Sequence, residues 1–454
     1  MVSTDSRTDE TFHRLHPLTP LASGLRVGAP LLAFLAISAG ERQAGDHSGL
    51  LTTTIIFVVV AVLVTIKGFI SLAVTRYRLE AGELRVDSGL ITRQSKRLRL
   101  DRLQSVDVRQ PLAPRLLGLA ELRIVTAGAA RESVHLSYLA EPVARQLRAE
   151  MMGRAAGLGP GVAEAPEQPL TSVDPGILIW STVLSLVSWR IAPVFFVAFG
   201  IIATALHHSS ENLPGAIAGA VFVILVAIGQ VLWARINNLW NFKIAQSPDG
   251  LRVRRGLLNT QTNTIPPGRI QALRIHQPLL WRLFGWATLQ INIAGSGDRR
   301  QRFDHILLPV APIEHARWLL STALGGVNVE AVELTRPPSR AWVVAPLWWR
   351  YMAAGSDDRI FVTRHGLFSR SLEVVPNERT QSVHLHAGPI ARWIRLASVH
   401  LDSTRGPVRI RARHRDNGEA RKMLDTQADR ARRARSVASP SRWMQSPSAT
   451  SQGQ

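Results

Sequence analysis

Two hydrophobic patterns divide the chain. Long uncharged runs lie before residue 75 and between residues 176 and 236, whereas elsewhere apolar residues alternate with polar ones, as at Leu84, Val86, Leu98 and Leu100. Alternation with a period of two is typical of a half-buried β-strand, and long uncharged runs are typical of helices in a membrane. The pattern therefore predicts strand-rich domains attached to membrane-embedded segments.

The strand-rich pattern occurs three times. The copies contain segments that begin at Gly89, Gly256 and Gly366, each followed by leucine and a further apolar residue. At the same spacing in every copy come the pairs Arg102 and Gln104, Arg269 and Gln271, and Arg379 and Gln381, and then Arg115, Arg282 and Arg392. Spacing kept without a gap predicts three copies of one domain.

Each copy ends in a helical pattern. Apolar residues recur three or four positions apart within Tyr138 to Met152, Pro309 to Leu324 and Gly418 to Val437. Such spacing predicts a helix with one buried stripe. Several short antiparallel strands followed by one packing helix predict an all-β or α+β domain, a barrel or sandwich capped by its C-terminal helix.

The order of these motifs resembles a known family. The quoted motifs are Tyr77-Arg78-Leu79, Gly89-Leu90-Ile91, Arg102-x-Gln104-Ser105-Val106 and Arg115-Leu116-Leu117-Gly118-Leu119. Placed after a pair of membrane spans, they resemble the bacterial pleckstrin-homology-like (bPH) domain membrane proteins of the YdbT type. The resemblance covers residues 77–153 and 242–324 well and 351–430 less well, since Arg395 replaces the glycine found at Gly118 and Gly285. It implies seven-stranded PH-like β-barrels, each plugged by its C-terminal helix, and it assigns no biochemical role.

Four uncharged stretches predict helices that cross a membrane. They are Val27 to Ala39, Leu50 to Ile66, Ile191 to Leu206 and Pro214 to Ala234. The first is shorter than the roughly 20 residues that a span needs, but its entry, Arg26-Val27-Gly28-Ala29-Pro30, resembles Arg190-Ile191-Ala192-Pro193. We therefore expect four transmembrane helices in two hairpins. Ile177 to Trp189 fits either a helix lying in the membrane interface or an extension of the spanning helix.

The charges that flank these stretches predict their orientation. The two hairpin turns, at 40–49 and 207–213, contain one arginine, Arg42, and no lysine, whereas Lys and Arg residues follow the second and fourth stretches, beginning with Lys67 and Arg235. By the positive-inside rule the turns lie outside. We therefore expect a multi-pass protein of the cell membrane with all three domains and both termini in the cytoplasm.

Together these patterns predict the following organisation. A disordered cytoplasmic leader (1–24) precedes transmembrane hairpin 1 (25–75), PH-like domain 1 (76–155), a linker (156–175), an interfacial helix with transmembrane hairpin 2 (176–236), PH-like domain 2 (237–326), a linker with an interfacial segment (327–350), PH-like domain 3 (351–436) and a disordered tail (437–454). The tryptophans of Val343 to Trp349 suit docking at a membrane interface or a contact between the second and third copies.

The strong positive charge indicates an anionic partner. Lys and Arg number 54 against 33 Asp and Glu, for a formal charge of +21. In the first copy Arg93, Lys96, Arg97 and Arg99 cluster, and in the third Arg409, Arg411, Arg413 and Arg415 alternate along one expected strand and so face one side. We expect these residues to contact anionic lipid of the inner leaflet, or else to form a solvated surface whose charge serves topology. The repeated glycines and Arg-x-Gln pairs are interpreted as structural, with a binding site as the alternative.

No catalytic motif was found. The chain lacks cysteine, a phosphate-binding loop and a His-Glu-x-x-His motif; His384, His386 and His400 could share a metal, but no acidic ligand lies close in sequence. We therefore predict no enzyme, no cofactor and no metal. The expected role is a non-enzymatic scaffold or assembly module that contacts anionic lipid and either other membrane proteins or itself. The alternatives are an accessory component of a membrane export, transport or stress-resistance system and, less favoured, nucleic-acid binding without sequence specificity.

Overall fold

The computed structural model describes most of residues 76–437. Gaps fall at 80–82, 89–93, 100–102, 127–132, 156–166, 248–249, 267, 295–302 and 405, and between 187 and 212 only a few helical positions are described. Outside this region the described residues are His13–Arg14 and helical positions 59, 63 and 66. The predicted leader and tail, and nearly all of the predicted first hairpin, lie outside the described residues.

Each of three repeats has a first set of three strands, a second set of three strands and a closing helix. In repeat 1 these are β2(Arg76–Leu79), β3(Glu83–Ser88) and β4(Gln94–Arg99), then β5(Leu103–Gln110), β6(Leu119–Thr126) and β7(Ser133–Ala140), and α4(Glu141–Ala155). In repeat 2 they are β9(Lys243–Ser247), β10(Gly250–Arg255) and β11(Thr260–Ile265), then β12(Ile270–Gln277), β13(Trp286–Ile293) and β14(Ile306–Pro312), and α9(Ile313–Ala323). In repeat 3 they are β15(Ala353–Ser356), β16(Ile360–His365) and β17(Arg370–Pro376), then β18(Ser382–His386), β19(Leu396–Asp402) and β20(Ile410–Asp416), and α11(Asn417–Val437).

A short helix joins the first two strands of each second set. These helices are α3(Leu112–Leu116), α8(Leu279–Leu283) and α10(Pro389–Trp393). The buried side chains of strands and helices form three hydrophobic clusters, one centred on each repeat. Two of the clusters cross the joint between repeats 2 and 3: the core of repeat 2 takes in Ile360, Val362 and Val374 of repeat 3, and the core of repeat 3 takes in Ala272 of repeat 2. Burial of these apolar side chains is the main stabilising contribution to each repeat.

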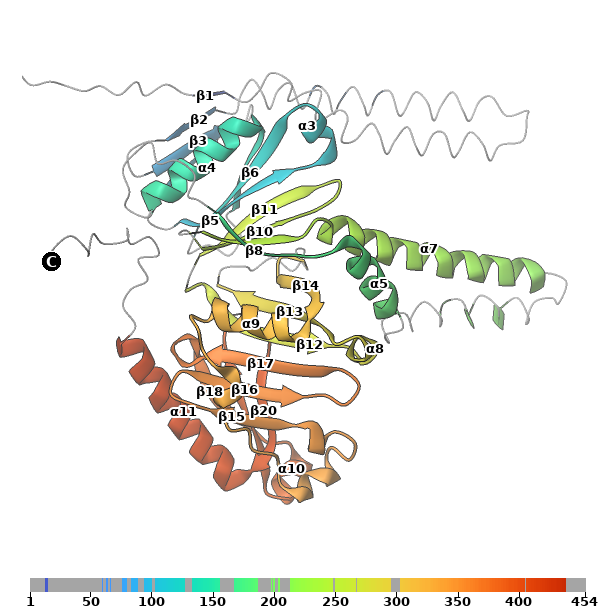
Figure 1. The fold of residues 1–454 in the computed structure, drawn as a ribbon, viewed down its shortest axis with the longest axis vertical. Coiled ribbons are helices and arrows are strands. Elements are labelled where there is room, and N and C mark those ends of the chain that lie inside the picture. The colour runs from blue at the N-terminus through green and yellow to red at the C-terminus, as the bar shows by residue number, and fades with distance from the viewer. Residues whose placement is uncertain are drawn as a thin grey trace, which may run out of the picture.

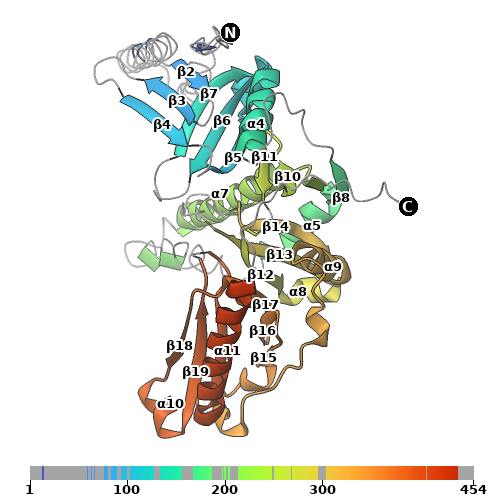
Figure 2. The same ribbon diagram turned by 90° about the vertical axis from the view of Figure 1, so that its left-hand side faces the viewer.

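The repeats are joined through shared sheets. The second set of repeat 1 and the first set of repeat 2 form one sheet, in the order β7-β6-β5-β11-β10-β9, which β8(Gln168–Ser172) extends at its edge. The second set of repeat 2 and the first set of repeat 3 form another, in the order β14-β13-β12-β17-β16-β15. Figures 1 and 2 show the resulting stack of repeats. Main-chain hydrogen bonds therefore hold the three repeats together as one body.

The repeated glycine has a structural cause. Gly256 has φ 114° and Gly366 has φ 107°, a region of backbone conformation that favours glycine. A Cβ at Gly256 would overlap the carbonyl oxygen of Asn259, and one at Gly366 would overlap that of Ser369. In both repeats the glycine lets the chain turn tightly from the second strand into the third.

A helical segment leaves the body between repeats 1 and 2. It contains α5(Pro175–Leu186) and α7(Leu213–Leu239), and Figure 1 shows α7 running away from the sheets. The strands on either side, β8 and β9, pair antiparallel, with Ser172 opposite Lys243. The chain therefore leaves and re-enters at the same sheet edge.

The prediction of four transmembrane helices in two hairpins is wrong. Among the described residues one helix is long and apolar enough to cross a membrane, Ile217–Leu239, with mean hydropathy 2.4 and 6% of its window buried. Of the predicted span Ile191 to Leu206 only a few helical positions are described, and the helix before it, α5, has 12 residues and packs on the second repeat. There Ser181 and Thr182 are buried and the indole of Trp281 donates to the Ser181 carbonyl oxygen at 3.0 Å.

Candidate functional site

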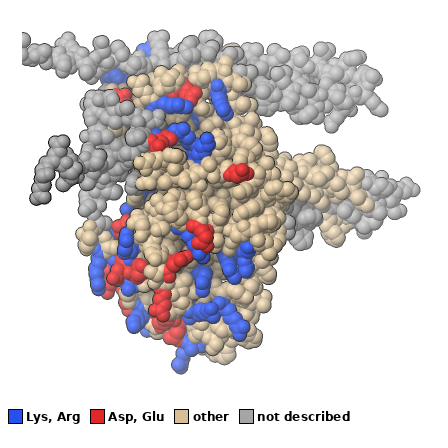
Figure 3. Space-filling view, viewed as in Figure 1, with Lys and Arg blue, Asp and Glu red and all other residues tan. Residues whose placement is uncertain are grey.

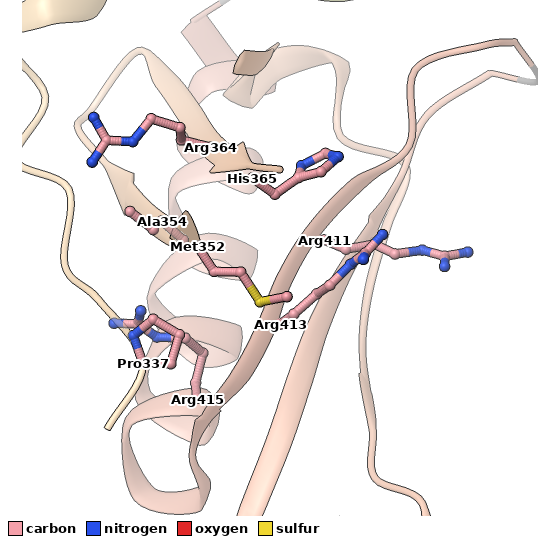
Figure 4. Close-up of a pocket in the computed structure, with 9 residues that line it drawn as sticks. Pro337, Met352, Ala354, Arg364, His365, Arg411, Arg413 and Arg415 are labelled. Atoms are coloured by element: carbon pink, nitrogen blue, oxygen red, sulfur yellow. The ribbon is translucent and has the colours of Figure 1, made fainter. Parts of the chain in front are cut away.

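A basic hollow lies in repeat 3, between its first sheet and β20. It is lined by Pro337, Met352, Ala353, Ala354, Arg364, His365, Arg411, Arg413 and Arg415. About 200 Å³ of empty space, open solvent included, lies among these residues, and as the side chains stand it holds no enclosed room for a water molecule. Figure 4 shows the side chains of Arg411 and Arg413 extending past His365, with Met352 between the two walls and Arg364 directed away. The hollow is thus lined by cationic side chains and by a small apolar surface that includes Met352 and Ala354.

Two strands, β16 and β20, supply the basic groups. Arg364 and His365 end β16, directly before the tight turn at Gly366. On β20, Arg411 and Arg413 alternate with the buried Ile410 and Ala412, as the period of a strand requires. The core therefore fixes β20 from one face and leaves its arginines half-exposed on the other.

The charged forms of the basic side chains in the hollow are destabilised by burial and by one another. Burial lowers the pKa of Arg413, and the neighbouring Arg411 lowers it further. Burial also lowers the pKa of His365, which Glu373 opposes and Arg413 reinforces. Positive groups are thus crowded in partly desolvated positions. An anion bound between them would relieve this repulsion.

The nearest carboxylate is already engaged. Glu373 is 1% exposed, and its carboxylate lies 2.9 Å from the Arg274 guanidinium and accepts from the Thr363 hydroxyl at 3.2 Å. Its distance to Nδ1 of His365 is 3.9 Å. Among the described residues, no carboxylate lies at hydrogen-bonding distance from Arg364, Arg411 or Arg413. The hollow therefore has more positive charge than its own acid can compensate.

The second repeat shows the compensated counterpart. Arg254 and Arg255 precede Gly256 as Arg364 and His365 precede Gly366. Arg254 is paired with Glu167 at 2.6 Å, and the buried Arg255 is paired with Asp304. The same two positions therefore carry internal ion pairs in repeat 2. In repeat 3 they border the hollow, where Arg364 has no carboxylate partner among the described residues and His365 lies 3.9 Å from Glu373.

The four arginines predicted on one face of the last strand do not stay together. Arg415 is 1% exposed and bonds to the Thr335 carbonyl oxygen at 2.8 Å, to the Thr335 hydroxyl and to Glu419. The strand changes register beside it, and His414 has φ 53°. This bulge turns Arg415 inward, while Arg411 and Arg413 remain half-exposed and Arg409, before the strand, is exposed.

The predicted basic cluster of repeat 1 lies on another element. Lys96, Arg97 and Arg99 are exposed on β4, and Arg93 lies outside the described residues. In the view of Figure 3, acidic and basic side chains are interspersed over the lower repeats, and α7 is free of charged side chains where it extends outward. A role of the β4 residues in contacting lipid stays a prediction.

The repeated Arg-x-Gln pairs have different surroundings. Arg269 donates to the Leu103 carbonyl oxygen of repeat 1 at 3.4 Å, and burial lowers its pKa to about 10. Gln271 is buried, whereas Gln381 is exposed; Arg379 pairs with Glu378 at 3.0 Å. Gly89 and Arg102 lie outside the described residues, and of Gln104 only its place in β5 is described. The pairs form no common site in the two repeats that can be compared.

The histidines of repeat 3 come together on β18 and β19. The His400 ring centroid lies 5.1 Å from that of His384 and 5.6 Å from that of His386, and Nδ1 of His384 is 3.3 Å from Asp402. The pKa of His400 is lowered to about 4, mainly by burial and secondly by the positive charge of Arg411. In the described part of the chain no group of three or more such side chains has the geometry to hold a metal ion.

Sequence reasoning missed Met352, Arg364 and His365 as site residues. A signal was present, since a basic dipeptide precedes the repeated glycine in the second and third copies but is replaced by Asp87-Ser88 in the first. The distance between Arg364 and Arg411 along the chain hides the fact that β16 and β20 lie close together. Only the fold brings the two basic segments to one hollow.

Comparison with known proteins agrees with this architecture. The family model of the bacterial PH domain matches residues 30–155, 176–327 and 319–431. The chain is also similar to the UPF0699 transmembrane protein YdbT of Bacillus subtilis (strain 168), with 25% identity over 272 residues, or 54% of this chain and 54% of that protein. It thus matches about half the length of this curated relative. The resemblance inferred from the sequence is confirmed, and the chain belongs to the bacterial PH domain family.

Proposed function

We propose that this chain is a membrane-held, non-enzymatic scaffold whose third repeat binds the anionic headgroup of a membrane lipid. The observation that carries the proposal is the uncompensated basic hollow. Arg364, Arg411 and Arg413 have no carboxylate partner among the described residues, whereas Arg254, the counterpart of Arg364 in repeat 2, is paired with Glu167. A phosphate with oxygen acceptors and negative charge fits such a set of donors.

Attachment to a membrane is supported by two observations. The apolar helix Ile217–Leu239 has little contact with the body, and the name of the curated relative describes that protein as transmembrane. Because the repeats share sheets, they face one side of the membrane together. Arg235 near the C-terminal end of the apolar helix and Lys243 after it favour the cytoplasmic side.

The scaffold role is supported by the way in which the repeats are joined. Two shared sheets fix three PH-like units in one body, which presents several surfaces at constant spacing. Attraction to an anionic leaflet contributes about 1 kcal/mol of binding free energy for each Lys or Arg near the membrane surface. One specific hollow and a diffuse basic surface can therefore act in concert.

The test uses the purified full chain in neutral detergent. Its melting temperature is measured with dioctanoyl phosphatidylglycerol, with dioctanoyl phosphatidylcholine and with inorganic phosphate. We expect the anionic lipid to raise the melting temperature and the zwitterionic lipid to leave it unchanged. A rise with phosphate of equal size would identify a free anion as the ligand; a rise with neither anion would overturn the proposal.

Two variants separate the hollow from the general charge. Arg411→Gln combined with Arg413→Gln should abolish the shift by the anionic lipid while leaving the lipid-free protein folded, because the change removes mutual repulsion. Arg409→Gln is the matched control, since Arg409 is exposed and does not line the hollow. Equal loss in both variants would indicate a diffuse basic surface and reject the hollow as the site.

A further inference from the structure

The two shared sheets follow one rule. In each, the first strand of one repeat's second set pairs antiparallel with the third strand of the next repeat's first set: β5 with β11, and β12 with β17. By this rule β4 and β18 are left over at the two ends of the chain. Both are edge strands of their sheets, and Figure 2 shows each at the outer side of its repeat.

The two joints also have the same register. Thr260 lies opposite Gln110 in the first joint, and Arg370 lies opposite Gln277 in the second. Thr260 and Arg370 stand at the same distance after Gly256 and Gly366, and Gln110 and Gln277 stand at the same distance after Gly89 and Gly256. The pairing is therefore a property of the repeat and not of one interface.

A side-chain contact recurs at both joints. Arg115 of α3 donates to the Leu257 carbonyl oxygen at 3.2 Å, and Arg282 of α8 donates to the Leu367 carbonyl oxygen at 3.0 Å. In each case the acceptor follows the repeated glycine of the next repeat. The corresponding residue of the last repeat is Arg392, which is exposed and has no side-chain hydrogen bond to any described residue.

We infer that β18 of one molecule pairs with β4 of a second copy of this chain, in the register of the two internal joints. Gln94 then lies opposite His386, and Lys96 lies opposite His384. These four side chains are exposed on their edges. The contact is head-to-tail, because two different edges meet, and it leaves a free β4 and a free β18 for further copies.

The chemistry of the two edges is compatible with this pairing. β18 has five residues, and the second internal joint uses five paired positions. Lys96 would face His384, whose Nδ1 is 3.3 Å from the Asp402 carboxylate, so that a negative group lies within reach of the lysine. Exposed edge strands with unpaired main-chain groups readily accept another strand.

The inference deepens the proposed scaffold role and needs no lipid in the basic hollow. A lipid-induced shift in melting temperature tests the hollow, whereas the following test reports the distance between two strands. Either proposal can fail while the other stands.

The chain has no cysteine, so that introduced cysteines report on single positions. Full-length Gln94→Cys and His386→Cys chains with different tags are co-expressed, and their membranes are treated with a mild oxidant. Opposite positions of an antiparallel pair have Cβ atoms about 4.5–5.5 Å apart, close enough for a disulfide with small adjustments. We expect a covalent dimer that carries both tags, and higher species when one chain carries both cysteines.

Two controls make a negative result decisive. Gln110→Cys with Thr260→Cys in one chain should form an intrachain disulfide, since these positions are paired within the molecule. In the second control, the Gln94→Cys chain is co-expressed with an Asp358→Cys chain in place of the His386→Cys chain. Asp358 is 95% exposed and lies away from the β18 edge. If the intrachain control forms and Gln94→Cys with His386→Cys yields no more dimer than the Asp358 control, the inference is overturned.

A charge exchange tests the register with the same cysteine pair. His384→Lys in the His386→Cys chain places a like charge opposite Lys96 and should reduce the dimer several-fold. Lys96→Glu in the Gln94→Cys chain should then restore it, because opposite charges on facing positions attract. Failure of the second change to restore the dimer would reject this register.

Discussion

Arg274 and Glu373 face each other across the β12–β17 pair, with 2.9 Å between Nη2 and the carboxylate. One belongs to repeat 2 and the other to repeat 3, so that this ion pair lies in the joint between them. Glu373 is 1% exposed and Arg274 20%. The pair is therefore largely shielded from water, where loss of one partner is costly.

Glu373→Ala should destabilise the junction of repeats 2 and 3. The change leaves Arg274 without its carboxylate and removes the acceptor of the Thr363 hydroxyl. Breaking a buried pair costs about 3–5 kcal/mol, and we expect the lower end here because Arg274 retains some solvent. The measurement is the melting temperature of the full chain, with protease sensitivity between the repeats as a second readout.

The double variant Arg274→Met with Glu373→Leu is the control for this effect. Replacing both charges with apolar groups of similar size leaves no orphaned charge and should recover most of the lost stability. A double variant as unstable as Glu373→Ala would show that the cost arises from packing rather than from the unpaired arginine.

Arg282→Met should loosen the same joint by another route. It removes the half-buried hydrogen bond to the Leu367 carbonyl oxygen, and such a bond from a charged donor contributes about 1.5–3 kcal/mol. Arg392→Met is the matched change at the corresponding exposed position and should leave the melting temperature of the monomeric chain nearly unchanged. Equal effects of the two substitutions would contradict a role for Arg282 in joining the repeats.

The sequence predicted the repeat but not the way in which repeats are joined. The fixed spacing from Gly256 to Arg282 shows that both positions matter within one copy. It does not show that Arg282 bonds to the turn of the following copy, because spacing within a copy is the same whichever copy supplies the acceptor. The shared sheets were missed for the same reason.

Hydropathy also has a limit that α5 illustrates. Its uncharged sequence is consistent with a membrane helix, yet Ser181 and Thr182 are buried against the body, while Trp180 is exposed. Apolar composition does not distinguish a membrane contact from a protein contact. In the basic hollow, alternation placed Arg411 and Arg413 on one face, but the bulge at His414, which no residue pattern announces, separated Arg415 from them.

Arg395→Gly should stabilise repeat 3. Arg395 has φ 56°, as Gly118 has φ 67° and Gly285 has φ 64°, so that all three repeats use the left-handed conformation before the second strand of the second set. A residue with a Cβ is strained by about 1 kcal/mol in this conformation, and glycine removes the strain. Part of the resulting gain in stability is offset, because glycine has greater conformational freedom in the unfolded chain. A small rise in melting temperature is expected.

The reciprocal substitution checks the interpretation. A Cβ at Gly285 meets no heavy atom within 4 Å, so that Gly285→Arg tests the backbone conformation without a clash of the Cβ. It should lower the melting temperature by a similar amount. If Arg395→Gly were destabilising, the arginine side chain would contribute contacts that outweigh its backbone strain.

Asp107 makes the joint between repeats 1 and 2 sensitive to pH. Its side chain is buried, and its pKa is raised from 3.8 to about 6. Burial is the larger cause and the negative charge of Asp304 the second, and both outweigh the opposing charges of Arg109, Arg123 and Arg148. Because the folded-state pKa lies above the unfolded value, the folded protein binds the proton more tightly. Stability from this group is therefore gained as pH falls from about 6 toward 4 and is lost as pH rises through that window.

Asp107→Asn should remove the destabilisation that the buried, ionised carboxylate causes at neutral pH. A pKa difference of about two units corresponds to roughly 3 kcal/mol at most, and we expect a gain of about 1–3 kcal/mol at pH 7.5 that narrows toward pH 4.5. The comparison is the difference in melting temperature between the native chain and the variant at each pH, since other groups titrate in both. Asp358→Asn, at an exposed position, controls for the loss of one negative charge. An advantage of Asp107→Asn that is the same at both pH values would show that the buried carboxylate is not the titrating group.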